Sequence, residues 1–337
     1  MGINQEEKQL KPNDFASDQE VRWCPGCGDY AILNAVKRTL ADIKADKSKT
    51  VFVSGIGCSS RLPYYMSTYG FHTIHGRAPA FATGIKLTNP ELDVWVITGD
   101  GDSLSIGGNH FIHVFRRNLN CQILLFNNEI YGLTKGQASP ASRTGTISPS
   151  TPKGSLESPL SACELALSAG STFIARGVDT SIKQLVPTLI EAQNHKGASL
   201  VEIYQNCIVY NDDVFNSFTE KSKAADRQIH LEHGKPMLFG IDKSKGLKLS
   251  SDNSKLELVD LSINKKEENK IIIHDKNNKT MAYLLTQMNE NTMPMALGVL
   301  YSINKPTLDN YYTDRINEHK NEISDVLEKG QIWTIQE

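Results

Sequence analysis

The sequence predicts an α/β fold with a mostly parallel sheet and helices on both faces, and two observations support this prediction. Between residues 28 and 210, helical patterns alternate with short apolar runs, as in strand–helix repeats. The runs VWVIT, QILLF and SLVEIY are bordered by Gly, Asn, Asp or charged residues, which is typical of buried parallel strands. We therefore expect residues 1–235 to form the main domain.

The elements of this domain can be read in chain order. An amphipathic stretch, AILNAVKRTLADI, predicts the first helix, because its apolar residues recur at helical spacing. Four apolar stretches predict strands that run into polar or glycine-rich loops. These stretches are TVFVSGIG (50–57), LDVWVITGDGD (92–102), CQILLFNNEIYG (121–132) and LVEIYQNCIVY (200–210).

The composition changes after about residue 236. Residues 236–337 are rich in Lys, Asn, Ser and Asp with isolated apolar clusters, so we interpret them as a polar C-terminal extension containing a small strand or two. Near its end, TDRINEHKNEISDVLEKGQ predicts an amphipathic helix that stops at Gly330 and packs on the body or on a partner subunit.

Composition limits the function classes. The 337 residues contain 36 Lys and Arg against 38 Asp and Glu, so no broad basic surface favours nucleic acid or an anionic membrane. The charged N-terminal segment lacks the apolar stretch of a signal peptide, and no run of apolar residues is long enough to span a membrane. We expect a cytoplasmic protein whose six cysteines are reduced thiols, ligands or catalytic groups.

Polar and glycine-rich loops follow three predicted strands. GIGC, GDGD and NNEIYG should meet at the carboxyl edge of the sheet, where α/β folds bind ligands. Glycines let a backbone approach a phosphate, and the carboxylate of Asp100 and the amide oxygen of Asn128 are hard ligands suited to Mg²⁺. A lone GDG also marks ordinary turns, but GDG and NN after successive strands form a more specific pattern.

Four cysteines occur in loops with ligand-like spacing. Cys24 and Cys27 form a Cys-x-x-Cys loop in WCPGCG, Cys58 lies in GIGCSS, and Cys207 follows a predicted strand. Four thiolates suit either an iron–sulfur cluster or a structural zinc ion, and the first two alone could form a redox pair. Two further cysteines fit no ligand spacing and are expected to be small buried side chains: Cys121 and Cys163.

The order of these motifs carries a family resemblance. WCPGCG, GIGCSS, HGRAP, GDGD, NNEIYGLTKGQ and a late cysteine, over residues 14–238, resemble the beta subunit of 2-oxoacid:ferredoxin oxidoreductases. The resemblance implies the thiamine-diphosphate-binding fold, with thiamine diphosphate and Mg²⁺ as cofactors. It also implies a [4Fe-4S] cluster on the four loop cysteines, and Mg²⁺ ligands from Asp100, Asn128 and the carbonyl of Ile130.

The resemblance further implies a set of residues around the cofactor. For His75, a helix cap or a core hydrogen bond is the alternative interpretation. The cofactor-binding residues are expected to be Gly57, Cys58, Ser59, His75, Gly76, Arg77, Gly99, Asp100, Gly101, Asp102, Asn128, Ile130, Gly132, Leu133 and Thr134.

Substrate choice is predicted from two cations, Lys135 and Arg61. The distal carboxylate of 2-oxoglutarate needs a cation in the pocket, whereas pyruvate has no such group. Relatives that accept 2-oxoglutarate have lysine at the position of Lys135, and those that act on pyruvate typically have glycine. We therefore expect coenzyme A-dependent oxidative decarboxylation of 2-oxoglutarate to succinyl-CoA and CO₂, with pyruvate or another 2-oxo acid as the alternative substrate.

The resemblance also implies partners. No catalytic glutamate is assigned in this chain, because in the family the glutamate that activates thiamine comes from an alpha subunit. We therefore expect a heterodimer, or a dimer of heterodimers, that passes electrons to a ferredoxin. Two rival interpretations are a non-redox thiamine-diphosphate decarboxylase, which has no use for four cysteine ligands, and a zinc-stabilised scaffold subunit without turnover.

Overall fold

The computed structural model describes residues 10–288, 290–318 and 323–329. Within these residues, eight strands form one sheet in the order β2-β1-β3-β4-β8-β7-β13-β9. All neighbours are parallel except β13 and β7, which confirms the predicted mostly parallel sheet. The strands are β1 Thr50–Ser54, β2 Tyr69–His72, β3 Asp93–Gly99, β4 Cys121–Asn127, β7 Phe173–Val178, β8 Ala198–Tyr204, β9 Gln228–Leu231 and β13 Met295–Ser302.

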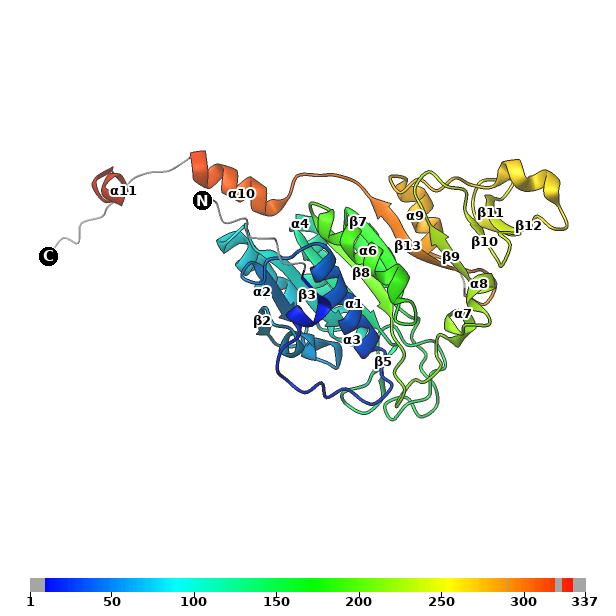
Figure 1. The fold of residues 1–337 in the computed structure, drawn as a ribbon, viewed down its shortest axis with the longest axis horizontal. Coiled ribbons are helices and arrows are strands. Elements are labelled where there is room, and N and C mark those ends of the chain that lie inside the picture. The colour runs from blue at the N-terminus through cyan, green and yellow to red at the C-terminus, as the bar shows by residue number, and fades with distance from the viewer. Residues whose placement is uncertain (1–9, 289, 319–322, 330–337) are drawn as a thin grey trace, which may run out of the picture.

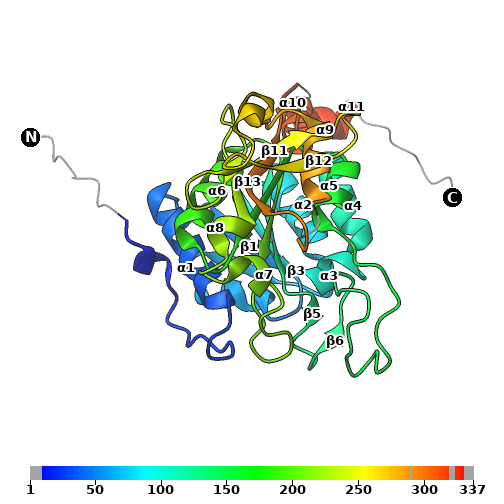
Figure 2. The ribbon, with the colours of Figure 1, turned by 90° about the vertical axis from the view of Figure 1, so that its right-hand side faces the viewer.

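Helices cover both faces of this sheet, as predicted (Figure 2). Helices α1 and α6 pack against each other on one face, and α2, α4 and α5 cover the other. The helices are α1 Asp29–Asp42, α2 Ala78–Thr88, α3 Asp100–Leu104, α4 Gly108–Arg117, α5 Ala162–Ser168, α6 Ile182–Asn194, α7 Asn216–Thr219, α8 Ala224–Arg227 and α9 Lys279–Thr286, with 3₁₀ turns η1 Pro12–Phe15, η2 Ser59–Tyr65 and η3 Lys265–Lys270.

The core is split by the sheet into two layers, because successive side chains of a strand point to opposite faces. On β3, Val94 and Val96 belong to the layer under α2 and α4, while Trp95 and Ile97 belong to the layer under α1 and α6. Both layers are fully buried around the central strands. Such continuous burial explains why these strands are apolar along their whole length. The two cysteines outside the loops are buried as predicted: Cys121 begins β4, and Cys163 lies in α5.

The C-terminal extension contains a small antiparallel sheet of β10 Leu238–Phe239, β11 Lys245–Leu249 and β12 Leu256–Asp260 at one end of the molecule (Figure 1). Beyond it the chain returns to the body, because β13 inserts between β7 and β9 of the main sheet. The polar composition of residues 236–337 does not predict this strand. β13 therefore belongs to the main sheet although it lies after residue 236. The domain boundary near residue 236 stays a prediction.

The predicted terminal helix is present in two described segments, α10 Leu308–Glu318 and α11 Ile323–Lys329 (Figure 1). The first turn of α10 packs on the body, because Asp309 accepts from the Asn120 backbone N–H at 3.0 Å and Leu308 packs against the core. The predicted stop at Gly330 lies outside the described residues. In the part of the chain that is described, no helix is both long and apolar enough to cross a membrane.

Candidate functional site

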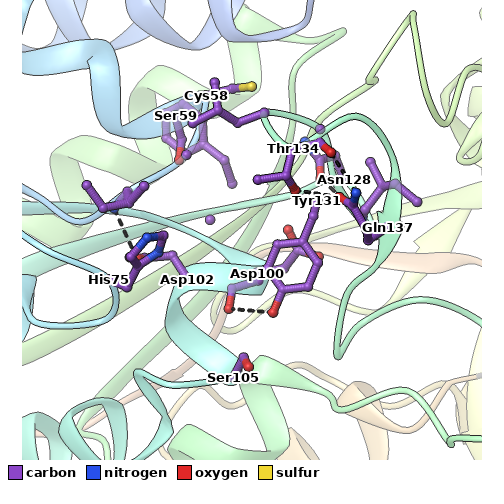
Figure 3. Close-up of a pocket in the computed structure, with 18 of the residues that line it drawn as sticks. Cys58, Ser59, His75, Asp100, Asp102, Ser105, Asn128, Tyr131, Thr134 and Gln137 are labelled. Atoms are coloured by element: carbon purple, nitrogen blue, oxygen red, sulfur yellow. Dashed lines mark hydrogen bonds between the residues drawn. The ribbon is translucent and has the colours of Figure 1, made fainter. Parts of the chain in front are cut away.

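A cavity of about 350 Å³ lies at the carboxyl edge of the sheet, where β1, β3 and β4 end (Figure 3). Its size is within the usual range for small-molecule sites, ~300–1,000 Å³. Its wall includes the glycine-rich loops that the sequence places after these strands. The predicted cofactor residues that line it are Gly57, Cys58, Ser59, His75, Gly99, Asp100, Gly101, Asp102, Asn128, Ile130, Gly132, Leu133 and Thr134.

Two predicted residues, Gly76 and Arg77, lie behind the wall and hold the His75 loop. The Gly76 backbone N–H donates to Asp102, and a Cβ at Gly76 would lie 2.3 Å from the Cα of Gly107. The guanidinium of Arg77 donates to the His75 carbonyl at 3.3 Å. His75 itself is exposed, and the N-cap of α2 is Arg77, so His75 is neither a core residue nor this cap.

Asp100 begins α3 directly after β3, and its carboxylate is buried. Burial raises the pKa of Asp100 to about 6, although the Ser139 hydroxyl, 2.5 Å from Oδ2, and the backbone N–H of Asn128 both donate to it. A buried carboxylate of this kind is stabilised by a bound cation, which offsets the cost of desolvation. Asn128 and Ile130 line the same cavity, so the three residues predicted to supply Mg²⁺ ligands lie around one space. The Ile130 carbonyl accepts from the Gly132 backbone N–H at 3.1 Å.

Asp102 joins three segments of the cavity wall through its carboxylate. Oδ1 accepts from the backbone N–H of Ile56 at 3.0 Å and of Gly76 at 2.7 Å, and Oδ2 accepts from the Thr98 hydroxyl at 2.8 Å. A Cβ at Gly55 would lie only 1.9 Å from Oδ2, so only glycine allows this close approach. Asp102 therefore fixes the loops after β1 and β2 against the end of β3.

The loop cysteines meet beside this cavity. The Cys24–Cys27 turn is closed by the Cys27 backbone N–H, which donates to the Cys24 carbonyl at 3.0 Å. The indole N–H of Trp23 donates to the Cys58 carbonyl at 2.7 Å. Burial, the Asp29 charge and the nearby Cys207 raise the pKa of Cys58 to about 12, so the thiols of Cys58 and Cys207 are close enough to influence each other.

Gly132 lies beside both of these thiols. A Cβ at Gly132 would lie 3.4 Å from the Cys207 sulfur and 3.7 Å from the Cys58 sulfur, so both sulfurs face this glycine. Among the described residues, no three His, Cys, Asp or Glu side chains come together closely enough to hold a single metal ion. Asp29 lines the cavity close by, and both of its carboxylate oxygens are buried next to the Cys27 thiol. Burial raises the pKa of Asp29 to about 7.

The two predicted substrate cations lie outside the cavity wall. Lys135 is exposed at the turn between β5 Ile130–Tyr131 and β6 Gln137–Ala138, with a left-handed backbone (φ 77°). Arg61 lines a separate hollow with Glu20 and Arg22, although its backbone N–H donates to the Cys58 carbonyl. Their roles in substrate binding stay predictions.

Several residues that line the cavity are not among those predicted from the sequence. Tyr131 lies within the NNEIYG motif, and its hydroxyl donates to the Gly101 carbonyl at 3.2 Å. Asp29 follows the Cys-x-x-Cys loop by two residues, and Gln205 precedes Cys207 by two, so proximity to those motifs was the signal available. The others are Ile56, Ser105, Ile106, Phe126 and Gln137.

Comparisons with known proteins agree with this geometry. The family described as thiamine pyrophosphate enzyme, C-terminal TPP binding domain, matches residues 55–203, which include the wall of the cavity after β1, β3 and β4. The 2-oxoglutarate oxidoreductase subunit KorB of Mycobacterium tuberculosis is 43% identical, over 99% of this chain and 91% of its own length. The beta subunit of 2-oxoacid:ferredoxin oxidoreductase 1 of Aeropyrum pernix is 49% identical, over 56% of this chain and 60% of its own.

A solved structure extends the likeness to three dimensions. The 2-oxoglutarate:ferredoxin oxidoreductase from Magnetococcus marinus, with 2-oxoglutarate, coenzyme A and succinyl-CoA bound, matches with a TM-score of 0.77 at 30% identity. The match covers 97% of this chain and 98% of that one. The similarity therefore includes the C-terminal extension as well as the cavity.

Proposed function

The chain belongs to the family of 2-oxoacid:ferredoxin oxidoreductase beta subunits, and on that premise we propose that it oxidises 2-oxoglutarate together with an alpha subunit. The reaction is the coenzyme A-dependent oxidative decarboxylation of 2-oxoglutarate to succinyl-CoA and CO₂, with a ferredoxin as electron acceptor. One observation carries the proposal: the diphosphate and magnesium motif and Cys58 line one cavity, and the other three loop cysteines lie close enough to interact electrostatically within this group.

Thiamine diphosphate supplies the carbon nucleophile and the electron sink when it is bound. Asp100, Asn128 and the Ile130 carbonyl are the proposed ligands of the Mg²⁺ ion that neutralises its diphosphate. The buried, unpaired charge of Asp100 supports a cation at this place. Ile106, Phe126 and Leu133 add apolar surface to the wall, which favours exclusion of water from the reacting centre.

We assign a [4Fe-4S] cluster to Cys24, Cys27, Cys58 and Cys207. The closeness of the four thiols supports a shared centre, because Cys24 and Cys207 act electrostatically on Cys58, and Cys58 and Cys207 act on Cys27. The family resemblance favours an iron–sulfur cluster over zinc as that centre. The cluster would lie next to the thiamine cavity, because Cys58 and Gly132 belong to the cavity wall. Such proximity favours transfer of electrons out of the site.

Selectivity for 2-oxoglutarate would come from Lys135 at the edge of the site. The preceding residues Leu133 and Thr134 line the cavity, so the lysine backbone is close to the site although its side chain is exposed. A lysine ammonium is a flexible point charge that can reach a distal carboxylate. Arg61 is the second candidate. Pyruvate or another 2-oxo acid is the alternative substrate, and it predicts no dependence on either cation.

An alpha subunit would complete the site. Several large apolar side chains are exposed on β2, on α2 and in the loops next to them, and an extended apolar surface marks a protein interface. Two of them directly neighbour cavity residues, since Ile74 precedes His75 and Ile106 follows Ser105. The exposed side chains are Tyr69, Phe71, Ile74, Phe81 and Ile106.

The test is to purify this chain with its alpha subunit under anaerobic conditions and to measure iron, sulfide, zinc and thiamine diphosphate. We expect about four irons and four sulfides per chain, and reduction of a ferredoxin that requires both 2-oxoglutarate and coenzyme A. Cys58→Ala should lose iron, whereas Cys121→Ala, a buried cysteine in the core, should keep it. Stoichiometric zinc without iron would contradict the proposal and favour a scaffold subunit.

A further inference from the structure

We propose that Gln205 is a positioning residue that joins the two cofactor sites, by one hydrogen bond to a cluster ligand and another to a magnesium ligand. This inference rests on the proposed function. Gln205 follows β8 directly, is 1% exposed and lines the cavity. Its backbone N–H donates to the Asn127 carbonyl at 2.9 Å, so the main chain of Gln205 is anchored to the end of β4.

The side-chain amide of Gln205 has a distinct partner at each end. Its Nε2 donates to the Asn206 carbonyl at 2.5 Å and to the Cys27 sulfur at 3.2 Å. Its Oε1 accepts from the Nδ2 of Asn128 at 2.8 Å. The reverse orientation of the amide is excluded, because Oε1 would then face the Asn206 carbonyl oxygen. The direction of both bonds is therefore fixed.

The bond to Asn128 determines which end of the asparagine amide can face a cation. Because Nδ2 of Asn128 points to Gln205, its Oδ1 is the atom that can face the metal. Oδ1 accepts from the Ile130 backbone N–H at 3.3 Å, and its second lone pair remains for Mg²⁺, which prefers oxygen ligands. The Asn128 carbonyl is also held, by the side-chain Nδ2 of Asn211 at 2.9 Å. Partners of this kind orient metal ligands, and their loss typically weakens metal binding roughly 10- to 100-fold.

The bond to Cys27 acts on the cluster. An N–H donor on a ligating sulfur stabilises the reduced, more negative state of an iron–sulfur cluster, and so raises its reduction potential. One acidic residue near Cys27, Asp29, acts in the opposite direction. Gln205 thereby supplies a neutral donor to a proposed cluster ligand from the wall of the thiamine cavity.

Two substitutions separate these bonds. Gln205→Met removes both hydrogen bonds at similar side-chain length. Gln205→Glu keeps an acceptor for Asn128. Its second oxygen takes the place of Nε2 and, as the protonated acid, can donate to the Asn206 carbonyl, so this variant loses only the donor to Cys27. A matched control is Gln122→Met, since Gln122 is also 2% exposed but lies on β4 outside the cavity wall.

The readouts are the cluster reduction potential, by redox titration followed with electron paramagnetic resonance, and the affinity for thiamine diphosphate at fixed Mg²⁺, both on the complex with the alpha subunit. We expect Gln205→Met to lower the potential and to weaken cofactor binding roughly 10-fold or more. Gln205→Glu should lower the potential while keeping the affinity within about threefold of the wild type, a smaller loss than removal of an orienting partner. Gln122→Met should change neither.

The outcomes are distinct. If wild-type protein contains neither cluster nor thiamine diphosphate, the proposed function fails. If wild-type protein binds both, and Gln205→Met changes only one readout or none, the joint role of Gln205 is overturned. Equal losses of affinity in Gln205→Met and Gln205→Glu would refute the role of the bond to Asn128, because only Gln205→Glu keeps an acceptor for it.

Discussion

Replacing Asp102 by alanine should loosen the cavity wall far more than replacing it by asparagine. Alanine leaves three buried donors without their acceptor: the backbone N–H groups of Ile56 and Gly76, and the Thr98 hydroxyl. A buried donor without a partner costs about 1–3 kcal/mol. The Thr98 hydroxyl can turn toward the Gly99 carbonyl, 3.4 Å away. Most of the loss of stability therefore comes from the two backbone N–H groups. We expect Asp102→Ala to lower the free energy of unfolding by about 4 kcal/mol.

Asparagine keeps the shape of Asp102 and one acceptor oxygen. Oδ1 can still accept from both backbone N–H groups, and the Thr98 hydroxyl can reverse and accept from the new amide. The loss should then be about 1 kcal/mol, from the missing charge alone. Urea unfolding of the full chain without cofactors, followed by circular dichroism, measures both values. Equal stability of the two variants would show that Asp102 does not hold these loops.

Three further predictions concern other residues. Gly101→Ala would place a Cβ 2.2 Å from the Tyr131 ring. The affinity for thiamine diphosphate, measured by fluorescence titration, should therefore fall roughly 10-fold. Gly108→Ala is the control and should leave the affinity unchanged, because a Cβ there would meet nothing within 4 Å. Lys135→Ala should reduce kcat/KM for 2-oxoglutarate much more than for pyruvate, because only 2-oxoglutarate has a distal carboxylate, and equal losses would refute its role in selectivity. Burial lowers the pKa of His195 to about 4, whereas an unfolded histidine titrates near ~6.5. As the pH falls, the unfolded chain therefore binds the proton first. The contribution of His195 to the free energy of unfolding should be fully present above pH ~6.5, and the free energy of unfolding should fall by about 2 kcal/mol toward pH 4. His195→Asn should remove this part of the pH dependence in thermal unfolding.

The fold and most of the cavity wall could be predicted because they depend on local sequence. A buried parallel strand is apolar along its length, and the loop after it must be polar or glycine-rich, so β3 with Asp100 and β4 with Asn128 are visible in the sequence. The family resemblance assigns functions to residues whose spacing alone leaves them open. For the four loop cysteines, it favours an iron–sulfur cluster over zinc.

What could not be predicted depends on contacts between distant segments. Gln205 is separated by 178 residues from Cys27, and no local pattern indicates that their side chains meet. Asp102 belongs to the predicted GDGD motif, but its bonds to the loops after β1 and β2 require the folded sheet. Arg61 lies in the 3₁₀ turn η2 and lines a hollow with Glu20 and Arg22, a neighbourhood that the sequence around Cys58 does not indicate; its role in substrate binding stays a prediction.

The insertion of β13 between β7 and β9 has a consequence for synthesis of the protein. β7 is complete at Val178, but its antiparallel neighbour begins at Met295, 117 residues later by subtraction of those numbers. At a synthesis rate of roughly 5–20 residues per second, the growing chain exposes one edge of β7 for roughly 6 to 23 s. An open strand edge pairs readily with other chains. The C-terminal extension thus acts as a late closing step, and a nascent chain that stops before β13 is left with an edge that invites aggregation.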